Sequence, residues 1–247
     1  MERNLILFAA VLFGVFAGAA ARASDVPRND KVQFAKAEEI KGDAARLRNN
    51  NPEAIYYYRS ALHISGQNPT LLNKLAVAEL QTGDRGAARK HLNQAVRYDP
   101  RNVPAWNNLG VVACVDRKYN AAIRYLKNAL ALEETNASAH LNMAEAWFGL
   151  GDVDRAMTEY ARALELNADI LSSNPGAVVA HVSTPEQRAR VAFTIAKAYA
   201  KRGNIEGALE YLRRAKDGNY PDLKKVYSDE TFAALWSDPR LQKIVKR

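Results

Sequence analysis

The sequence predicts an all-α protein built as a stack of helix pairs. Its 247 residues are 48% hydrophobic and include only 13 Gly and 9 Pro, a composition that favours helix over strand. Similar residues recur at a fixed interval of 34 positions. Such a period is typical of repeat proteins, in which each helix pair buries its apolar face against the next pair.

The recurring positions alternate between small and large side chains. Small residues let two antiparallel helices approach closely, and the large residue between them fills the remaining space. The same interval also links Gly42, Ala76, Gly110 and Ala144 earlier in each unit. The small–large–small series consists of Ala54, Ala88, Ala122 and Ala156; then Tyr58, Leu92, Leu126 and Tyr160; then Ala61, Ala95, Ala129 and Ala163.

The third unit resembles the tetratricopeptide-repeat (TPR) family. The family pattern is W-x2-L-G-x2-Y, followed by A-x3-F and a closing P. This resemblance implies a right-handed α-solenoid of about five TPR helix pairs, whose concave surface binds other proteins. The matching residues are Trp106, Leu109, Gly110, Ala113, Ala122, Leu126 and Ala129, with Pro100 closing the second unit.

We expect four contiguous units and a fifth after an interruption. The offset from Ala156 to Ala208 is 52 residues, which is one period of 34 plus 18. The extra stretch ends in a helix start at Pro185, so we interpret it as an insertion. The expected divisions are a lead-in at 24–34, units at 35–68, 69–102, 103–136 and 137–170, an insertion at 171–188, and a fifth unit at 189–222.

Turn residues support these divisions. Gly83, Gly151 and Gly203 each lie where the first helix of a unit must end and the chain must reverse. After the fifth unit, residues 223–247 are expected to form capping helices. Ser237-Asp238-Pro239 is a helix start, and the apolar residues around it would cover the exposed end of the stack. The Asp-Pro-Arg tail also resembles segments that follow TPR arrays in bacterial proteins.

The N-terminus predicts export. A charged start precedes an apolar run from Leu5 to Ala21, and the small-residue site Ala21-Arg22-Ala23 follows. This is the pattern of a signal peptide at 1–23, which would place the protein in the periplasm or outside the cell without an integral membrane span. The alternative is an uncleaved segment that anchors the protein in the membrane.

Charge and cysteine content argue against nucleic-acid-binding and disulfide-bonded classes of protein. Loss of residues 1–23 would change the formal charge from +8 to +7, that is, 33 basic minus 26 acidic residues. Both signs are interspersed, which does not favour nucleic-acid binding. Cys114 is the only cysteine, so no internal disulfide can form.

No motif indicates catalysis. His63, His91, His140 and His181 lie far apart in the sequence without a second ligand at metal-binding spacing. Neither a glycine-rich phosphate loop nor a Gly-x-Ser-x-Gly elbow occurs. The sequence therefore predicts no enzyme, no cofactor and no metal site.

The TPR resemblance implies a binding groove lined by the first helix of each unit. When the groove positions of the family are transferred to this sequence, the middle of the groove is apolar and amides flank it. Such a groove suits an amphipathic helix or an extended segment of a partner protein. The alternative is that these residues pack between helices. The predicted groove residues are Asn73, Val77, Leu80, Asn107, Asn108, Val111, Cys114, Leu141, Asn142, Glu145 and Phe148.

Three functional hypotheses follow. The first is a non-catalytic protein–protein interaction scaffold of the cell envelope. A narrower form is a pilus or secretion-system assembly factor, although a cysteine for lipid attachment, usual in such proteins, does not follow the apolar run. The third is a small-molecule receptor or enzyme using insertion 171–188, with His181, Glu186 and Lys197 as its ionisable residues. The oligomeric state and the partner are left open.

Overall fold

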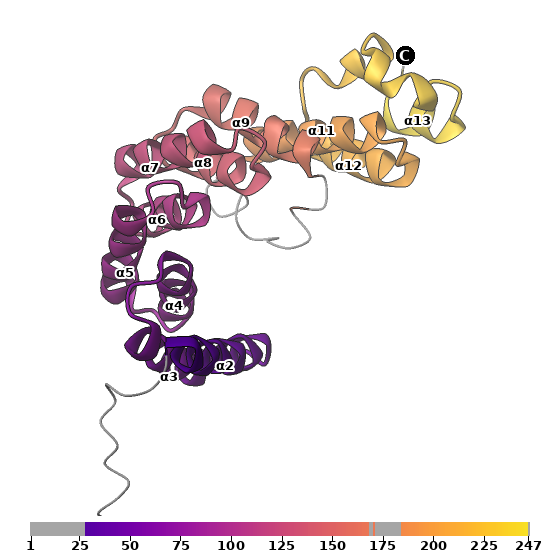
Figure 1. Ribbon diagram of the computed structural model, residues 1–247. Coiled ribbons are helices and arrows are strands. Elements are labelled where there is room, and N and C mark those ends of the chain that lie inside the picture. Colours follow the sequence, from indigo (N-terminus) through magenta and orange to yellow (C-terminus); the bar gives the residue numbers. More distant parts are fainter. Residues whose placement is uncertain (1–27, 168–169, 171–183, 247) are drawn as a thin grey trace, which may run out of the picture.

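The computed structural model describes residues 28–167, 170 and 184–246. The predicted signal peptide at 1–23, the first residues of the lead-in and the insertion residues 171–183, including His181, lie outside this part of the chain. Within the described residues all the regular structure is helical. The predicted all-α solenoid is confirmed (Figure 1).

The described helices form five consecutive pairs, each joined by a short turn. The first helix begins at Arg28, seven residues before the first expected unit, and is longer than its counterparts. The pairs are α2 (Arg28–Leu47) with α3 (Asn51–Ser65), α4 (Pro69–Gln81) with α5 (Arg85–Tyr98), α6 (Val103–Val115) with α7 (Tyr119–Leu132), α8 (Ala137–Gly149) with α9 (Val153–Leu166), and α11 (Pro185–Lys201) with α12 (Ile205–Asp217).

Repeated asparagine caps start the first helices. Asn68, Asn102 and Asn136 stand 34 residues apart, and each side-chain oxygen accepts a hydrogen bond from the backbone N–H three residues later, at 2.9 to 3.1 Å. Such caps satisfy donors that the first helical turn leaves without a partner. The pattern fixes where each unit starts and hence the register of the stack.

The turn inside each pair requires a left-handed backbone. Gly83, Gly151 and Gly203 have φ of 84°, 79° and 73°, a conformation that only glycine adopts without steric cost. Asn49 and Arg117 occupy the same position in the other two pairs, both with φ of 57°. The turn geometry is thus set by the packing of the two helices even where glycine is absent.

The small–large–small series forms the contact between helices. All twelve of its residues are almost completely buried. A Cβ atom on Gly110 would lie 2.6 Å from Cγ of Leu126, far inside van der Waals contact. A side chain at this glycine is therefore excluded by the close approach of α6 and α7.

Trp106 and Pro100 connect the second and third pairs. The indole Nε1 of Trp106 donates a hydrogen bond to the carbonyl oxygen of Pro100 at 2.9 Å. The same ring stacks on Tyr125, with ring centroids 6.2 Å apart. These TPR motif positions therefore join successive pairs as well as filling space.

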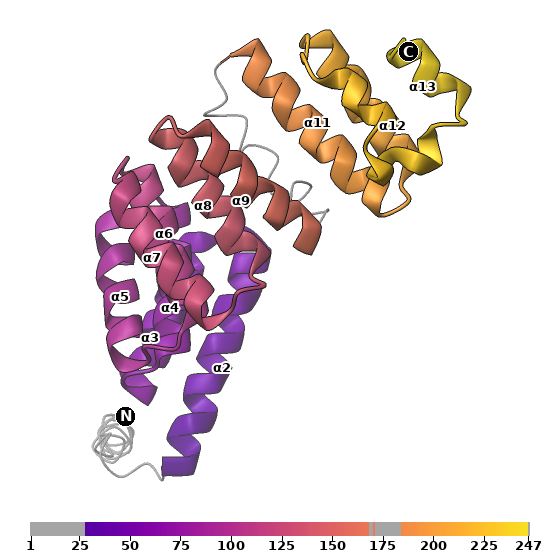
Figure 2. The ribbon, with the colours of Figure 1, turned by 90° about the horizontal axis from the view of Figure 1, so that it is seen from above.

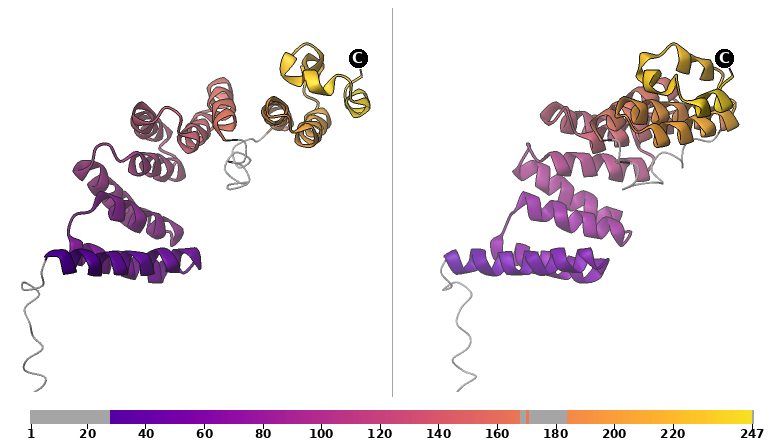
Figure 3. Two further views of the ribbon diagram at one scale, coloured as in Figure 1. Left: turned by 45° about the vertical axis from the view of Figure 1, so that its right-hand side comes forward. Right: turned by 90° about the vertical axis from the view of Figure 1, so that its right-hand side faces the viewer.

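The pairs stack along a bend. α5 and α7 lie on its outer side, and α4 and α6 lie toward its inner side (Figure 1). The first helix α2 and the C-terminal elements stand at opposite ends of the stack (Figure 2). Two further views show the pairs as successive layers (Figure 3). The first helices of successive pairs also contact each other directly, α4 with α6 and α6 with α8.

The fifth pair continues the stack after the insertion. Thr184 and Gln187 form a reciprocal capping box at the start of α11, with Pro185 in its first turn. Val191 and Ile195 of α11 lie in one apolar cluster with Tyr160 of α9. This shared cluster joins the fourth and fifth pairs.

The tail after the fifth pair consists of short helical elements. It comprises two 3₁₀ segments, η1 (Leu223–Tyr227) and η2 (Glu230–Leu235), and the short helix α13 (Pro239–Ile244). Asp229 caps η2 by accepting from the N–H of Thr231, only two residues on. Six apolar tail residues are buried in one cluster with α11 and α12: Val226, Phe232, Leu235, Leu241, Ile244 and Val245.

The Asp-Pro-Arg segment attaches α13 to the stack. Asp238 accepts a hydrogen bond from the backbone N–H of Arg240 at 2.8 Å and thereby caps the helix. The Arg240 guanidinium binds Asp238 and also reaches Glu206 on α12 at 2.6 Å. These contacts place the tail over the last helix pair.

Candidate binding surface on the inner helices

A row of polar bonds links the first helices of the first four pairs. In each case the sixth residue of one unit donates to the fifth residue of the unit before it, 35 positions earlier. The three bonds join Lys74 to Glu39 at 2.6 Å, Asn108 to Asn73 at 2.8 Å, and Asn142 to Asn107 at 2.9 Å. We call these six residues the polar ladder.

The ladder carries charge only at its N-terminal end. Lys74 also binds Asp43 at 2.7 Å, and the hydroxyl of Tyr58 donates to the same carboxylate at 2.8 Å. Partial burial alone would raise the pKa of Glu39 and Asp43. The hydrogen bonds and charge of Lys74, together with Lys36 at Glu39 and Tyr58 at Asp43, outweigh it and hold both pKa values below their usual range. The remaining ladder residues are neutral amides.

Lys74→Met should destabilise the protein by about 1 kcal/mol at pH 7 and by much less at pH 3, because this ion pair is partly exposed. Carboxylates with a lowered pKa stabilise the fold above their unfolded pKa of about 4, and this contribution is lost as pH falls through the folded value. Urea unfolding at both pH values measures the difference, with Lys118→Met as an exposed control. A loss independent of pH would mean that Lys74 acts through its methylene groups alone.

The amides predicted to hydrogen-bond a partner already bond to one another. Asn107 and Asn108 are adjacent, with Nδ2 of the first 3.5 Å from Oδ1 of the second, so the amides form a nearly continuous row from α4 to α8. An amide has two donor hydrogens and two acceptor lone pairs. One ladder bond therefore leaves further hydrogen-bonding capacity on each side chain.

The apolar residues of the predicted groove separate into two groups. Val77, Leu80 and Val111 are partly exposed. Cys114, Leu141 and Phe148 are buried, with 4%, 3% and 7% of their surface exposed. Leu141 and Phe148 belong to an apolar cluster that also contains residues of α9 and α11, so they form part of the packed core around the fourth pair. Glu145, on the same helix, is partly exposed.

Cys114 has the properties of a packed thiol. Burial, reinforced by the nearby charge of Glu145, raises its pKa to about 12. Its Sγ lies 3.9 Å from the carbonyl oxygen of Asn142. Because the thiolate is the reactive form of cysteine, this side chain is a poor nucleophile at neutral pH.

Two of the three histidines in the described residues, His91 and His140, pair with carboxylates. His91 Nδ1 lies 2.7 Å from Glu79 Oε2, and His140 Nδ1 lies 2.6 Å from Glu159 Oε2. The described residues contain no group of three or more His, Cys, Asp or Glu side chains that could hold a metal ion. A cavity of about 110 Å³ between α5, α6 and α7 is smaller than the pockets that usually take organic ligands.

The tetratricopeptide-repeat family matches residues 45–110, 116–181 and 189–217, which is more than half of the chain. The chain is a tetratricopeptide-repeat protein. The family mediates protein–protein interactions and is generally non-catalytic. No described helix combines the length and the apolar character needed to cross a membrane.

Curated relatives of this TPR protein are much longer than the segments that align with it. It is 27% identical over 163 residues to the BBSome complex member BBS4 of Bos taurus, covering 52% of this chain and 30% of the relative. It is also 27% identical over 151 residues to the heat-shock protein cognate co-chaperone sgt12 of Aspergillus fumigatus, covering 61% and 41%. The chain thus spans well under half the length of both.

Solved TPR structures share the fold. The Pseudomonas aeruginosa pilF structure aligns with a TM-score of 0.56 at 20% identity, covering 87% of this chain and 97% of the other. MamA from Desulfovibrio magneticus RS-1 aligns with a TM-score of 0.53 at 15% identity, covering 75% and 95%. At these identities the likeness establishes architecture alone.

The polar ladder was not foreseen, although its signal is in the sequence. Comparison of the sequence with itself at an offset of 34 residues aligns equivalent positions of successive units. Each ladder bond instead joins position five of one unit to position six of the next, which is an offset of 35 residues. A search for polar pairs at 35 would have found Glu39 with Lys74 and Asn107 with Asn142.

Proposed function

We propose that this TPR protein is a non-catalytic scaffold of the cell envelope that binds a peptide segment or helix of a partner protein on its inner helices. The observation that carries the proposal is the amide row on α4, α6 and α8, which lies beside partly exposed Val77 and Val111. Peptide recognition commonly combines polar groups for the backbone with apolar contacts for side chains.

The uncharged centre of this surface suggests the chemistry of the partner. Asn73, Asn107, Asn108 and Asn142 offer donors and acceptors to backbone amides, and the two carboxylates at the α2 end are paired with Lys74. A segment with apolar side chains and few charges would fit such a surface. Away from Glu145 on α8, strongly acidic or basic peptides would lose hydration at the amides without gaining an ion pair.

Val111→Glu should reduce recovery of a partner in a pull-down from the envelope fraction by at least tenfold, because it places a charge among the neutral amides. The matched control is Asn128→Glu on the exposed side of α7, which should leave recovery unchanged. Circular dichroism verifies that both variants are folded. Equal recovery with wild type and Val111→Glu would exclude this surface as the binding site.

Export is a separate part of the proposal, and the apolar N-terminus supports it. N-terminal sequencing of the protein from fractionated cells tests it, with a start at Ser24 in the envelope or secreted fraction as the expected result. A start at Met1 in the membrane fraction would instead support the uncleaved anchor. Recovery only from the cytoplasm would exclude an envelope role.

Pilus or secretion-system assembly is the narrower alternative. The likeness to pilF is one of fold, so this role depends on the predicted export. Deletion of the gene with normal piliation and secretion would exclude it.

The remaining alternative is a receptor or enzyme that uses insertion 171–188. One of the ionisable residues named for it, Lys197, already binds Asp229 at 2.6 Å. A metabolite that raises the melting temperature would support that reading.

A further inference from the structure

Two neighbouring outer helices carry positive charge without any acidic residue. α5 contains Arg85, Arg89, Lys90 and Arg97, and α7 contains Arg124 and Lys127, whereas neither helix contains Asp or Glu. Lys90 and Arg97 lie on the exposed stripe of α5, opposite the buried Ala88, Leu92 and Ala95. Arg124 and Lys127 occupy the same side of α7.

Four exposed cations on these two helices lack ion-pair partners in the described part of the chain. Arg85 and Arg89 bind Asp116, but no carboxylate of the described residues pairs with Lys90, Arg97, Arg124 or Lys127. We call these four residues the basic face. Four exposed cations without ion-pair partners on two successive outer helices point to an external anionic partner.

The rest of the outer surface does not share this charge. The positions equivalent to Lys90 and Arg124 are Tyr56 on α3, Thr158 on α9 and Glu210 on α12. α9 also contains three carboxylates and only two cations. Because the TPR fold requires no charge at these positions, the basic face is specific to the second and third pairs.

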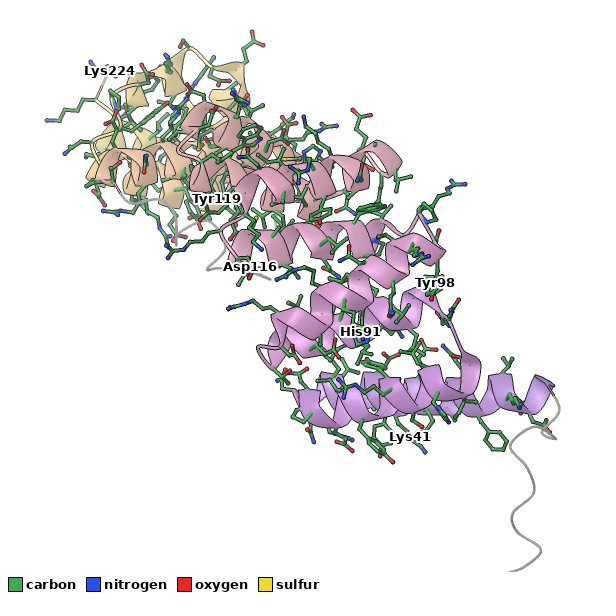
Figure 4. All side chains as sticks on the ribbon, turned by 90° about the vertical axis from the view of Figure 1, so that its left-hand side faces the viewer. Lys41, His91, Tyr98, Asp116, Tyr119 and Lys224 are labelled. Carbon is green, nitrogen blue, oxygen red and sulfur yellow. The ribbon has the colours of Figure 1, made fainter. Side chains whose placement is uncertain are left out.

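The shape of the molecule limits what can reach the basic face. α5 and α7 lie on the outside of the bend (Figure 1). Figure 4 views this side, with Tyr98 at the end of α5 and Tyr119 at the start of α7. The outer side of a bend encloses a single peptide segment poorly. A broad, flat anionic surface can contact several cations of the basic face at once.

Two exposed apolar side chains flank the basic face. Tyr98 and Leu132 stand 34 residues apart at the C-terminal ends of α5 and α7, with 41% and 42% of their surface exposed. Aromatic and aliphatic side chains next to Lys and Arg are typical of protein surfaces at the membrane–water interface. They favour a lipid surface over a nucleic acid, which would offer its phosphates but no apolar layer.

We propose that the basic face docks on a membrane surface containing anionic lipids. Charge complementarity supplies the attraction, and Tyr98 and Leu132 add apolar contact at one edge. Docking through α5 and α7 leaves the polar ladder on the inner helices turned away from the membrane. The proposal does not depend on peptide binding, because it concerns a different face of the stack.

The test is co-sedimentation of the full-length protein with vesicles of phosphatidylcholine, alone or with phosphatidylglycerol, at low and high salt. Wild type should bind the anionic vesicles at least tenfold more strongly, and added salt should reduce the difference. The variant with Lys90, Arg97, Arg124 and Lys127 all changed to Gln should lose at least tenfold in binding, since each cation near such a surface contributes about fivefold.

A second quadruple variant serves as the control, with Arg202, Arg213, Lys224 and Lys246 changed to Gln. These four cations are also exposed and without ion pairs in the described chain, so the net charge changes equally. It should retain most of the binding. Equal losses in the two variants, or equal binding of wild type to both vesicles, would overturn the proposal. Binding to DNA or polyglutamate without binding to vesicles would also overturn it.

Discussion

Phe232→Ala should destabilise the protein by about 3–5 kcal/mol and loosen the C-terminal tail. Phe232 is fully buried, and its ring lies 5.5 Å from that of Phe193 on α11, which in turn stacks on Tyr220 at 4.8 Å. Truncation would leave a cavity between the tail and the last helix pair. The short 3₁₀ segments of the tail cannot close it by forming local structure of their own.

Urea unfolding gives the global loss, and hydrogen exchange across residues 223–246 shows whether the tail opens first. Phe232→Leu should cost less because it keeps most of the apolar volume, and exposed Ala234→Ser should be near neutral. In a solenoid each unit is stabilised by its neighbours, so an uncovered end weakens the adjacent pair. A loss below about 1 kcal/mol for Phe232→Ala would show that the tail does not stabilise the stack.

His91→Leu should cost about 3–5 kcal/mol because it removes one partner of a buried carboxylate. Glu79 has only 1% of its surface exposed and is held by His91 at 2.7 Å and by Arg59 at 3.0 Å. With His91 gone, Oε2 of this buried carboxylate would lose its partner at 2.7 Å. The double variant Glu79→Leu/His91→Leu should be more stable than His91→Leu, since no buried charge would remain.

Denaturant unfolding of wild type, both single variants and the double variant forms a complete cycle. Arg59→Met is the control for the exposed partner and should cost less, because the Arg59 side chain is largely in solvent. If the double variant were less stable than His91→Leu, the carboxylate would have a packing role that charge alone does not explain.

The helix pairs followed from local chemistry that sequence comparison detects. Ala122 and Ala129 are small because α6 and α7 touch there, and Leu126 is large because it fills the space opposite Gly110. Gly83 marks a turn because its backbone needs positive φ. Each of these features depends on neighbours within one repeat, so the 34-residue period is enough to reveal it.

The candidate binding surface was only partly predictable. The asparagines lie on the inner helices, but their mutual bonds depend on the offset between successive pairs. Leu141 and Phe148 occupy groove positions by analogy, but they are buried in a cluster that joins α8 with residues of α9 and α11. The sequence period is interrupted between α9 and α11, so it carried no information about how closely the fifth pair would approach.

The amino-acid sequence by itself determined the helical class, the pairing of helices and the positions of most turns, because these depend on side-chain size and backbone freedom within about 34 residues. Only the tertiary structure decided which inner residues stay exposed, how the amides join successive pairs and how the basic face lies on the outside of the bend. These properties arise from packing across units, and comparison of equivalent positions at an offset of 34 does not reveal them.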